Sequence, residues 1–466
     1  MSTIDPTSLG FLLAENRNQP MHVAGLQLFE KPADAGPSFA REMYESALDT
    51  AEFSPLFLKH PTRTLGALGR WSWTEDTDFD VEHHVRHSAL PEPGRIRELL
   101  ELVSRLHGQM LARERPLWEA HIIEGLADGR VAMYTKLHHS LVDGISAMKL
   151  MQNVLSTDPD RRNMPLPFDA RALRKKKVRE TEETPLTEVP LDALRTAMGI
   201  TADAAGMPAA LIKTLTKGVR NEASALSFYA PKSMFNVNIT GSRRFAADDW
   251  PLERIRAVAK AGRATLNDVV LAMCGGAVRN YLLELNRLPD ASLVSMVPVG
   301  LKSRSAESES GGGGNAVGSV MVKLATDLSD PAERLAAINA SMKAGKEALE
   351  SMTPNQIVAM SALGMAPSLA IPMLRLNGIV RPPFNLIISN VPGPRSVQYL
   401  NGARLTGSYP VSVPMQGMAL NITCNSYADD MCFGLTGCRR SVPHLQRLLT
   451  YLDAELASLE NATGAA

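Results

Sequence analysis

The sequence has few cysteines and no excess of either charge, and its first residues do not resemble a secretory leader. Its four cysteines, at 274, 424, 432 and 438, form no Cys-x-x-Cys pair, so neither a zinc ribbon nor a dithiol redox motif is predicted. Lysine plus arginine and aspartate plus glutamate both number 49, and this balance argues against a general nucleic-acid binder. The first residues contain neither the basic nor the apolar segment of a signal peptide, which predicts a reducing, cytoplasmic location.

Long hydrophobic runs without helix breakers are also missing. The stretch 351–374 carries no charge, yet Pro354, Pro367 and Pro372 interrupt it. Proline removes helical hydrogen bonds that lipid cannot replace, so a membrane span is the least favoured interpretation. Broken helices beside a lipid pocket or on a membrane surface are favoured, with a buried helical hairpin as the alternative. We therefore expect peripheral contact with a membrane or a lipid inclusion.

Helical and strand-like patterns alternate in both halves of the chain, which at 466 residues is too long for one ordinary core. The expected fold class is α/β (α+β), with two lobes, each a mixed β-sheet flanked by helices, and a ligand site between them. The expected division is a first lobe over 1–160, a charged linker over 161–190, a connecting helical segment over 191–234 and a second lobe over 235–466. The linker composition, rich in cations, glutamates and prolines, is typical of solvated chain and could also contact anionic lipid.

Periodicity predicts the individual elements. Strands are expected at 23–29, 131–137, 293–299, 317–324, 386–389, 418–424 and 432–435. Helices are expected at 97–111, from 145 onward, and at 252–261, 266–285, 331–349 and 442–459. The glycines of 310–315 are followed by neither Gly-Lys-Ser/Thr nor a helix start, so they predict a connector and not a phosphate-binding loop.

Two adjacent histidines, His138 and His139, stand where the predicted strand 131–137 meets a helix, and Asp143 and Gly144 follow them. Histidine exchanges a proton near neutral pH without a large pKa shift, and a strand end holds a base rigidly. The pattern predicts a proton-transfer site, with a pair of buried, hydrogen-bonded histidines as the alternative.

A second histidine cluster, with His83, His84 and His87, lacks the Asp-Gly turn and the change from strand to helix. It predicts a polar strand or a strand edge. A metal site that uses His83 and His87 is a less favoured alternative, and we expect no bound metal.

Five segments in order give the chain the pattern of a known family. They are Arg115-Pro-Leu-Trp-Glu119, His138-His-x-x-x-Asp-Gly144, Leu266-Asn-Asp-Val-Val-Leu-Ala272, Gly314-Asn-x-x-Gly318 and Ser389-Asn-Val-Pro-Gly-Pro394. In these motifs the chain resembles the bacterial wax ester synthase/diacylglycerol acyltransferases. They belong to the coenzyme-A-dependent acyltransferase superfamily, together with chloramphenicol acetyltransferase and peptide-synthetase condensation domains. The resemblance covers nearly the whole chain and implies two chloramphenicol-acetyltransferase-like lobes with an active-site tunnel between them.

The resemblance implies transfer of a fatty acyl group from acyl-CoA to a long-chain alcohol or to diacylglycerol, with no permanently bound cofactor. His139 is then the general base that deprotonates the acceptor hydroxyl, and no covalent acyl-enzyme is expected, because the chain has no Gly-x-Ser-x-Gly segment. His138 is expected to shape the pocket or to hydrogen-bond beside the base. Asp143 is expected to be structural and to pair with an arginine, and Gly144 to permit a tight turn.

Other motif residues receive roles from the same resemblance. Asn267 is expected to donate a hydrogen bond to the oxygen of the tetrahedral intermediate, with a plain helix N-cap as the alternative. Trp118 is grouped with the substrate site, although packing between the lobes is favoured over direct substrate contact. Ser389 and Asn390 are expected to line the entrance of the substrate channel.

The CoA side of the site is less defined. Lys302 and Arg304 are expected to meet CoA phosphates, with contact to water alone as the alternative. Many members of the superfamily carry Asp-Phe-Gly-x-Gly near the C-terminus, and here 432–435 lacks the aspartate, so this segment assigns no residue to CoA. Two other functions stay open, namely condensation-type transfer from a carrier-protein thioester and non-catalytic lipid binding. The zero net charge favours self-association, so a homo-oligomer is a further expectation.

Overall fold

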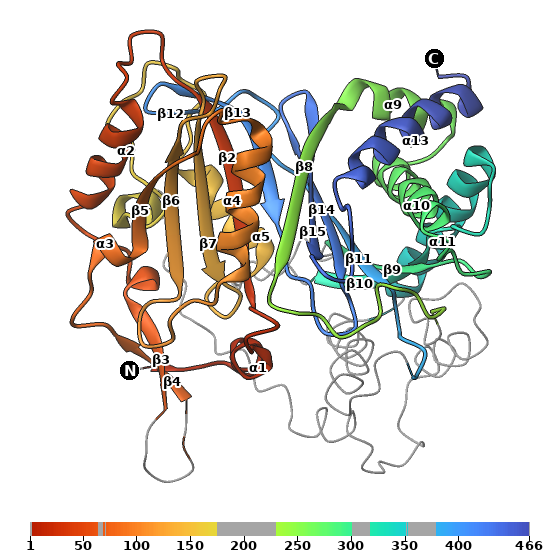
Figure 1. The fold of residues 1–466 in the computed structure, drawn as a ribbon, viewed down its shortest axis with the longest axis horizontal. Helices are drawn as coiled ribbons and strands as arrows, with labels where there is room; N and C mark the ends of the chain where they lie inside the picture. Colours follow the sequence, from red (N-terminus) through yellow and green to blue (C-terminus); the bar gives the residue numbers. More distant parts are fainter. Residues whose placement is uncertain are drawn as a thin grey trace.

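The computed structural model describes residues 2–63, 69, 71–174, 230–300, 317–350, 352 and 379–465. These residues form two lobes that lie side by side, the first half of the chain in red to yellow and the second in green to blue (Figure 1). The expected fold class is confirmed, whereas the tunnel between the lobes stays a prediction. Most of the charged linker, the connecting segment up to residue 229, the glycine loop and nearly all of 351–374 lie outside the described residues.

The first lobe contains a six-stranded sheet that is antiparallel except for its last pair. In spatial order its strands are β12 (Tyr399–Leu400), β13 (Ala403–Val411), β2 (His22–Glu30), β7 (Val131–His138), β6 (Trp118–Glu124) and β5 (Val85–Ala89). The helices of this half are α1 (Pro6–Ala14), α2 (Phe39–Leu48), α3 (Val81–His84), α4 (Ile96–Gly108), α5 (Gly144–Asn153) and α6 (Ala170–Arg174). Strand β7 is buried at every position, so its C-terminal end, which carries the two histidines, is rigidly held.

Strands β12 and β13 belong to the second half of the sequence but complete the first sheet. Residues Arg404 to Val411 pair with Glu30 to Ala24 of β2 in antiparallel register. The predicted division of the chain near residue 235 did not anticipate this exchange. The exact boundaries of the two lobes stay a prediction. The exchange joins the second half of the chain to the first sheet through the hydrogen bonds between β13 and β2.

The second lobe contains another six-stranded sheet, which is mixed because β11 runs parallel to both of its neighbours. Its spatial order is β10 (Val317–Lys323), β9 (Val294–Gly300), β11 (Leu386–Val391), β14 (Leu420–Tyr427), β15 (Asp430–Cys438) and β8 (Arg243–Pro251). The helices that pack with it are α9 (Leu252–Ala261), α10 (Leu266–Glu284), α11 (Pro331–Glu350) and α13 (Arg447–Thr463).

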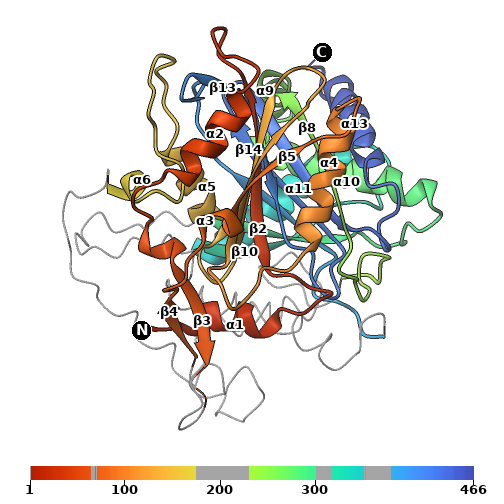
Figure 2. The same cartoon turned by 60° about the vertical axis from the view of Figure 1, so that its left-hand side comes forward.

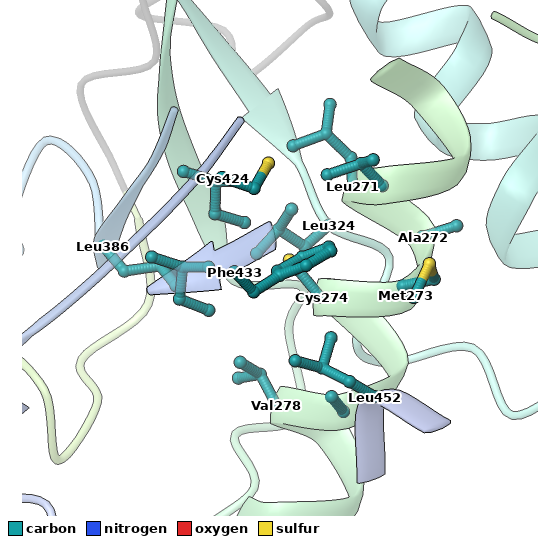
Figure 3. Close-up of a cluster of buried hydrophobic side chains, with 14 of the residues drawn as sticks. Leu271, Ala272, Met273, Cys274, Val278, Leu324, Leu386, Cys424, Phe433 and Leu452 are labelled. Carbon is teal, nitrogen blue, oxygen red and sulfur yellow. The ribbon is translucent and has the colours of Figure 1, made fainter. Parts of the chain in front are cut away.

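Helix α10 forms the centre of the second core. Figure 3 shows Leu271, Cys274 and Val278 of this helix facing Phe433 of the sheet and Leu452 of α13, and all five are buried. The four cysteines of the chain are buried and free, which agrees with the absence of a Cys-x-x-Cys motif. Cys274, Cys424 and Cys432 pack in the hydrophobic cores, whereas the Cys438 sulfur also accepts hydrogen bonds from the Thr240 backbone N–H and the Ser441 hydroxyl.

A small sheet supports the N-terminal helix. It consists of β1 (Ser2–Thr3), β4 (Trp71–Glu75) and β3 (Lys59–Arg63), and a 3-10 turn, η1 (Pro55–Phe57), precedes β3. Leu12 of α1 is fully buried in a separate core cluster with Trp73 and Leu117. Both ribbon views place α1 beside this sheet, at the lower edge of the first lobe (Figures 1 and 2).

Two further expectations can be compared with the structure. His83 and His84 lie in the short helix α3, so the predicted polar strand is wrong for this pair, whereas Val85–Ala89 does form an edge strand of the sheet. The strand begins only at Val85 because Asp80 caps a preceding helical turn, its side chain accepting from the Glu82 backbone N–H at 3.0 Å. Within the described part of the chain, no helix is long and apolar enough to cross a bilayer.

Candidate active site

The two histidines stand at the end of β7, where the chain leaves the sheet. His138 is the last residue of the strand, and its backbone N–H donates to Leu117 O at 3.0 Å. The backbone N–H of His139 donates to Met21 O at 2.8 Å, one residue before β2 begins. Segments from three parts of the chain therefore fix the backbone of the motif before any side chain is considered.

The His138 ring is fully buried and held on both sides. Its Nδ1 accepts from the Ser140 backbone N–H at 3.1 Å and lies 2.6 Å from Ser140 Oγ. Because an N–H group donates to Nδ1, the proton of the neutral ring is on Nε2. That nitrogen lies 3.4 Å from Glu15 Oε1. Because the ring is fully buried and its Nε2 faces a buried carboxylate, it fits the predicted supporting role.

The His139 ring is half-buried and lacks such partners. Among the described residues, no other residue hydrogen-bonds to either of its ring nitrogens, and its Nδ1 is buried. Burial lowers the pKa of His139 below its ordinary value, and the neighbouring His138 adds to this effect. Its own backbone and the Asp143 carboxylate raise the pKa by less. The ring is therefore neutral near pH 7, as a general base requires.

Asp143 and Gly144 begin the helix that follows. The Asp143 side chain caps α5 by accepting from the Ser146 backbone N–H at 2.7 Å, which is the predicted structural role. No arginine pairs with it among the described residues. Gly144 lacks a positive φ, and a Cβ built there would meet no atom within 4 Å. Gly144 is the first residue of α5, so its conformation does not require glycine, and the missing side chain leaves open space beside the motif.

Asn267 and Asn390, which are far apart in sequence, lie together in the second lobe. The Asn390 amide N–H donates to Asn267 Oδ1 at 3.4 Å. The N-cap alternative for Asn267 is wrong, because Thr265 caps α10 in a reciprocal box with Asp268. No hydrogen bond or ion pair connects Asn267 to either motif histidine within the described residues.

Ser389 and Asn390 point to opposite faces of the second sheet, because neighbouring residues of a strand alternate. Asn390 faces α10, whereas Ser389 shares a face with its register partner Thr423. The Thr423 hydroxyl lies 2.6 Å from Ser412 Oγ, at the end of the exchanged strand β13. Only Ser389 therefore lies on the face of this sheet that is turned toward the first lobe.

Trp118 lies inside the first lobe, so the expectation that it packs between the lobes is wrong. Its indole N–H donates to Phe57 O at 2.9 Å, and its ring stacks on His84 and Phe168. The side chain has no exposed surface with which to meet a substrate. Trp118 lies at the start of β6, where a large aromatic side chain fills the aromatic part of this core.

The next motif residue, Glu119, forms a buried ion pair that sequence reasoning missed. Its Oε2 lies 2.9 Å from the Nζ of Lys136, a fully buried side chain of β7. Lys136 Nζ also donates to Leu106 O and Gln109 O, each at 3.2 Å. Burial acts to raise the pKa of Glu119, but a hydrogen bond from His121 and the charge of Lys136 outweigh it and lower the pKa to about 2.

Sequence reasoning also missed three residues around the histidines, Ser8, Phe11 and Glu15. They recur at a spacing of three and four residues, which is a helical face, but the sequence does not show what that face meets. Lys302 and Arg304 lie outside the described residues, so their contact with CoA stays a prediction. In the described ranges, no three histidine, cysteine or acidic side chains are grouped in a way that could hold a metal.

Comparison with known proteins identifies close relatives over the whole chain. The model of the wax ester synthase/diacylglycerol acyltransferase catalytic domain matches residues 1–270, and that of the WS/DGAT C-terminal domain matches 313–460. Two Mycobacterium tuberculosis proteins, named probable and putative diacylglycerol O-acyltransferases, are 48% and 46% identical over the full length of both chains.

Solved structures show the same relationship. The wax ester synthase/diacylglycerol acyltransferase from Marinobacter aquaeolei VT8 is 41% identical with a TM-score of 0.79, and all of both chains is covered. The first condensation domain of the CDA synthetase has a TM-score of 0.55 at 15% identity, over 100% of this chain and 97% of that one. The second similarity concerns the fold alone.

Proposed function

This chain belongs to the wax ester synthase/diacylglycerol acyltransferase family of acyltransferases, and on that premise we propose that it esterifies diacylglycerol, or a long-chain alcohol, with a fatty acyl group taken from acyl-CoA. The names of the mycobacterial relatives favour diacylglycerol as an acceptor, and the family name favours both acceptors. Because acceptor and product are lipids, the same proposal includes peripheral contact with a membrane or lipid inclusion.

The two histidines differ in burial and in hydrogen bonding, and this difference is the observation that carries the proposed mechanism. His138 is fully buried, its Nδ1 accepts from the Ser140 N–H, and its Nε2 lies 3.4 Å from Glu15 Oε1, whereas His139 is half-buried, neutral at pH 7 and without a hydrogen bond from another described residue. This difference supports the second ring as the one that exchanges a proton with a ligand. A general base of this kind contributes typically about 10²–10⁴-fold to the rate.

In the proposed reaction, His139 takes the proton of the acceptor hydroxyl as its oxygen attacks the thioester carbonyl carbon. The tetrahedral intermediate collapses, the C–S bond breaks and the departing CoA thiolate takes the proton back from His139. The products are an ester and free CoA, and the imidazole is neutral again. No covalent acyl-enzyme, metal or resident cofactor takes part in this sequence.

Asn267 is the proposed hydrogen-bond donor to the oxygen of the intermediate. Its Oδ1 accepts from Asn390, which orients the amide and leaves the Asn267 Nδ2 group available as a donor. One such donor is worth roughly 2.7–4 kcal/mol in the transition state. If this role is correct, Asn267→Ala lowers kcat more than it changes KM, and the reverse pattern contradicts it.

The proposal is tested with purified protein and palmitoyl-CoA, offered dipalmitoylglycerol or hexadecanol in detergent. We expect release of free CoA thiol that depends on the acceptor, and formation of the matching ester. Intact-protein mass spectrometry during turnover should show no acylated species. Thiol release without an acceptor, or an acyl-enzyme that accumulates, contradicts the mechanism. Inertness toward both acceptors, with transfer only from carrier-protein thioesters, supports a condensation-type activity instead.

A further inference from the structure

One face of helix α1 meets the histidine motif residue by residue. Ser8 Oγ donates to Ser140 O at 2.8 Å, the Phe11 ring stacks on His139, and Glu15 at the C-cap faces His138. The spacing of three and four residues places 8, 11 and 15 on the same side of the helix. This arrangement joins a segment near the N-terminus to a motif more than 120 positions later in the chain.

Phe11 stacks on the His139 ring, to which no other described residue donates or accepts a hydrogen bond. Its ring centroid lies 4.1 Å from that of His139, and the two planes differ by 19°, which is a stacked arrangement. Since no other described residue hydrogen-bonds to the nitrogens of His139, stacking is the specific contact that sets the plane of the imidazole. It also covers one face of the ring and excludes water from it.

The ionised carboxylate of Glu15 faces the neighbouring ring, that of His138. Its side chain is fully buried, and its Oε1 faces His138 Nε2 and accepts from the Met21 backbone N–H at 3.1 Å. Arg113 donates twice to Glu15 Oε2, from Nε at 3.2 Å and from Nη2 at 3.1 Å. Burial acts to raise the pKa of Glu15, but His138, the Met21 amide and Arg113 outweigh it, so the pKa is lowered and the carboxylate is ionised.

Helix α1 is anchored well enough to position other groups. The Asp5 side chain caps its N-terminus by accepting from Thr7 N and Ser8 N at 3.0 and 2.9 Å. Arg113 Nη2 donates to Leu12 O at 2.6 Å near the other end, and the Leu12 side chain is fully buried. A displacement of Phe11 would therefore have to disrupt this packing.

We propose that helix α1 is a positioning element of the acyl-transfer site, in which Phe11 sets the plane of the His139 ring and Glu15, together with the Ser140 backbone N–H, keeps the proton of His138 on Nε2. This inference rests on the proposed role of His139 as the base. Phe11 and Glu15 lie outside all five sequence motifs. In this inference they affect the chemical step by positioning the histidines, and not by contact with the substrate.

The first test replaces the flat face of Phe11 while keeping its apolar bulk. Phe11→Leu is expected to lower kcat on the order of 10–100-fold with little change in KM, because the base is no longer held in its productive orientation. Water also gains access to His139, which raises its pKa, so the acid limb of the kcat profile moves to higher pH. Phe11→Tyr retains the ring and is expected to keep the wild-type profile. Leu13→Ala, at the exposed position of the same helix, is the matched control.

The second test reads the tautomer of His138 directly. Protein labelled with ¹⁵N-histidine is examined by long-range ¹H–¹⁵N spectroscopy, which distinguishes Nδ1–H from Nε2–H rings. The wild type is expected to show Nε2–H at His138. Glu15→Gln is expected to show a mixture of tautomers and a lower kcat, because an amide NH2 group that faces His138 Nε2 favours the Nδ1–H ring, whose proton Ser140 Oγ at 2.6 Å can accept.

The possible results separate this inference from the proposed function. If His139→Ala is inactive while Phe11→Leu matches Leu13→Ala in kcat and in pH profile, α1 is only structural and the inference is overturned. An unchanged His138 tautomer in Glu15→Gln overturns the part that concerns Glu15. If His139→Ala retains wild-type turnover, the proposed mechanism itself fails, whatever the α1 variants do.

Discussion

Replacing Glu119 by glutamine is expected to cost about 3 kcal/mol of unfolding free energy at pH 7. A pKa of about 2, compared with an ordinary value of 4.5, corresponds to about 3 kcal/mol of stabilisation by the ionised form. An independent estimate agrees, because removing one partner of a buried ion pair costs about 3–5 kcal/mol. Its partner Lys136 is fully buried and would be left as an unpaired charge in the centre of the first sheet.

The effect of Glu119→Gln should depend on pH in a defined direction. A carboxyl group with a lowered pKa stabilises the folded state fully above its ordinary pKa, and this contribution is lost as the pH falls from 4.5 toward 2. The difference between variant and wild type should therefore be constant from pH 8 to about 5 and shrink below that.

Urea unfolding at several pH values measures this difference. Glu124→Gln is the matched control, because Glu124 lies on the same strand, is 35% exposed and pairs with His87 at 3.2 Å. An exposed pair of this kind contributes about 0–1 kcal/mol. The reasoning is refuted if Glu119→Gln is no more destabilising than the control, or if its effect does not change with pH.

Three further variants test other parts of the structure. Asp143→Asn keeps a side chain that can cap α5 but removes a carboxylate that raises the pKa of His139. The acid limb of the kcat–pH profile should therefore move to lower pH, and a shift to higher pH contradicts this. Gly276→Ala places a Cβ against the buried carboxyl of Glu455, so urea unfolding should show a loss of about 1–3 kcal/mol, and a neutral result contradicts it. Gly144→Ala meets open space, so unfolding should change by less than about 1 kcal/mol, and a larger loss would mean that the turn needs glycine after all.

The elements that could be predicted are those whose local pattern agrees with their surroundings. Helix α10 was expected at 266–285 and is found at Leu266–Glu284, because the run from Val269 to Val278 is apolar without interruption and buried at every position. Strand β13 was missed, although alternate residues from Ala403 to Val411 are buried. Gly407 and Pro410 obscure the pattern, and the partner strand β2 lies almost 380 residues earlier, which no local signal reveals.

In the candidate site, too, some features could be predicted from the sequence and others could not. The position of His138 and His139 at a strand end, and the structural role of Asp143, followed from residue type and spacing. The contact of Phe11 with His139 could not be predicted, because it depends on how a separate helix packs against the end of β7. The error over Trp118 has a related cause, since an aromatic residue in a motif suits a lobe interface and a lobe interior equally well until its neighbours are known.

The central claim, that the imidazole of His139 removes the acceptor proton, is tested most directly by the turnover of His139→Ala. The control is His83→Ala, which alters the other adjacent histidine pair, and both variants should unfold at the wild-type temperature. With saturating palmitoyl-CoA and diacylglycerol, we predict that His139→Ala loses at least about 10²-fold in kcat while His83→Ala stays at the wild-type rate. A folded His139→Ala protein that releases CoA at the wild-type rate would contradict the account.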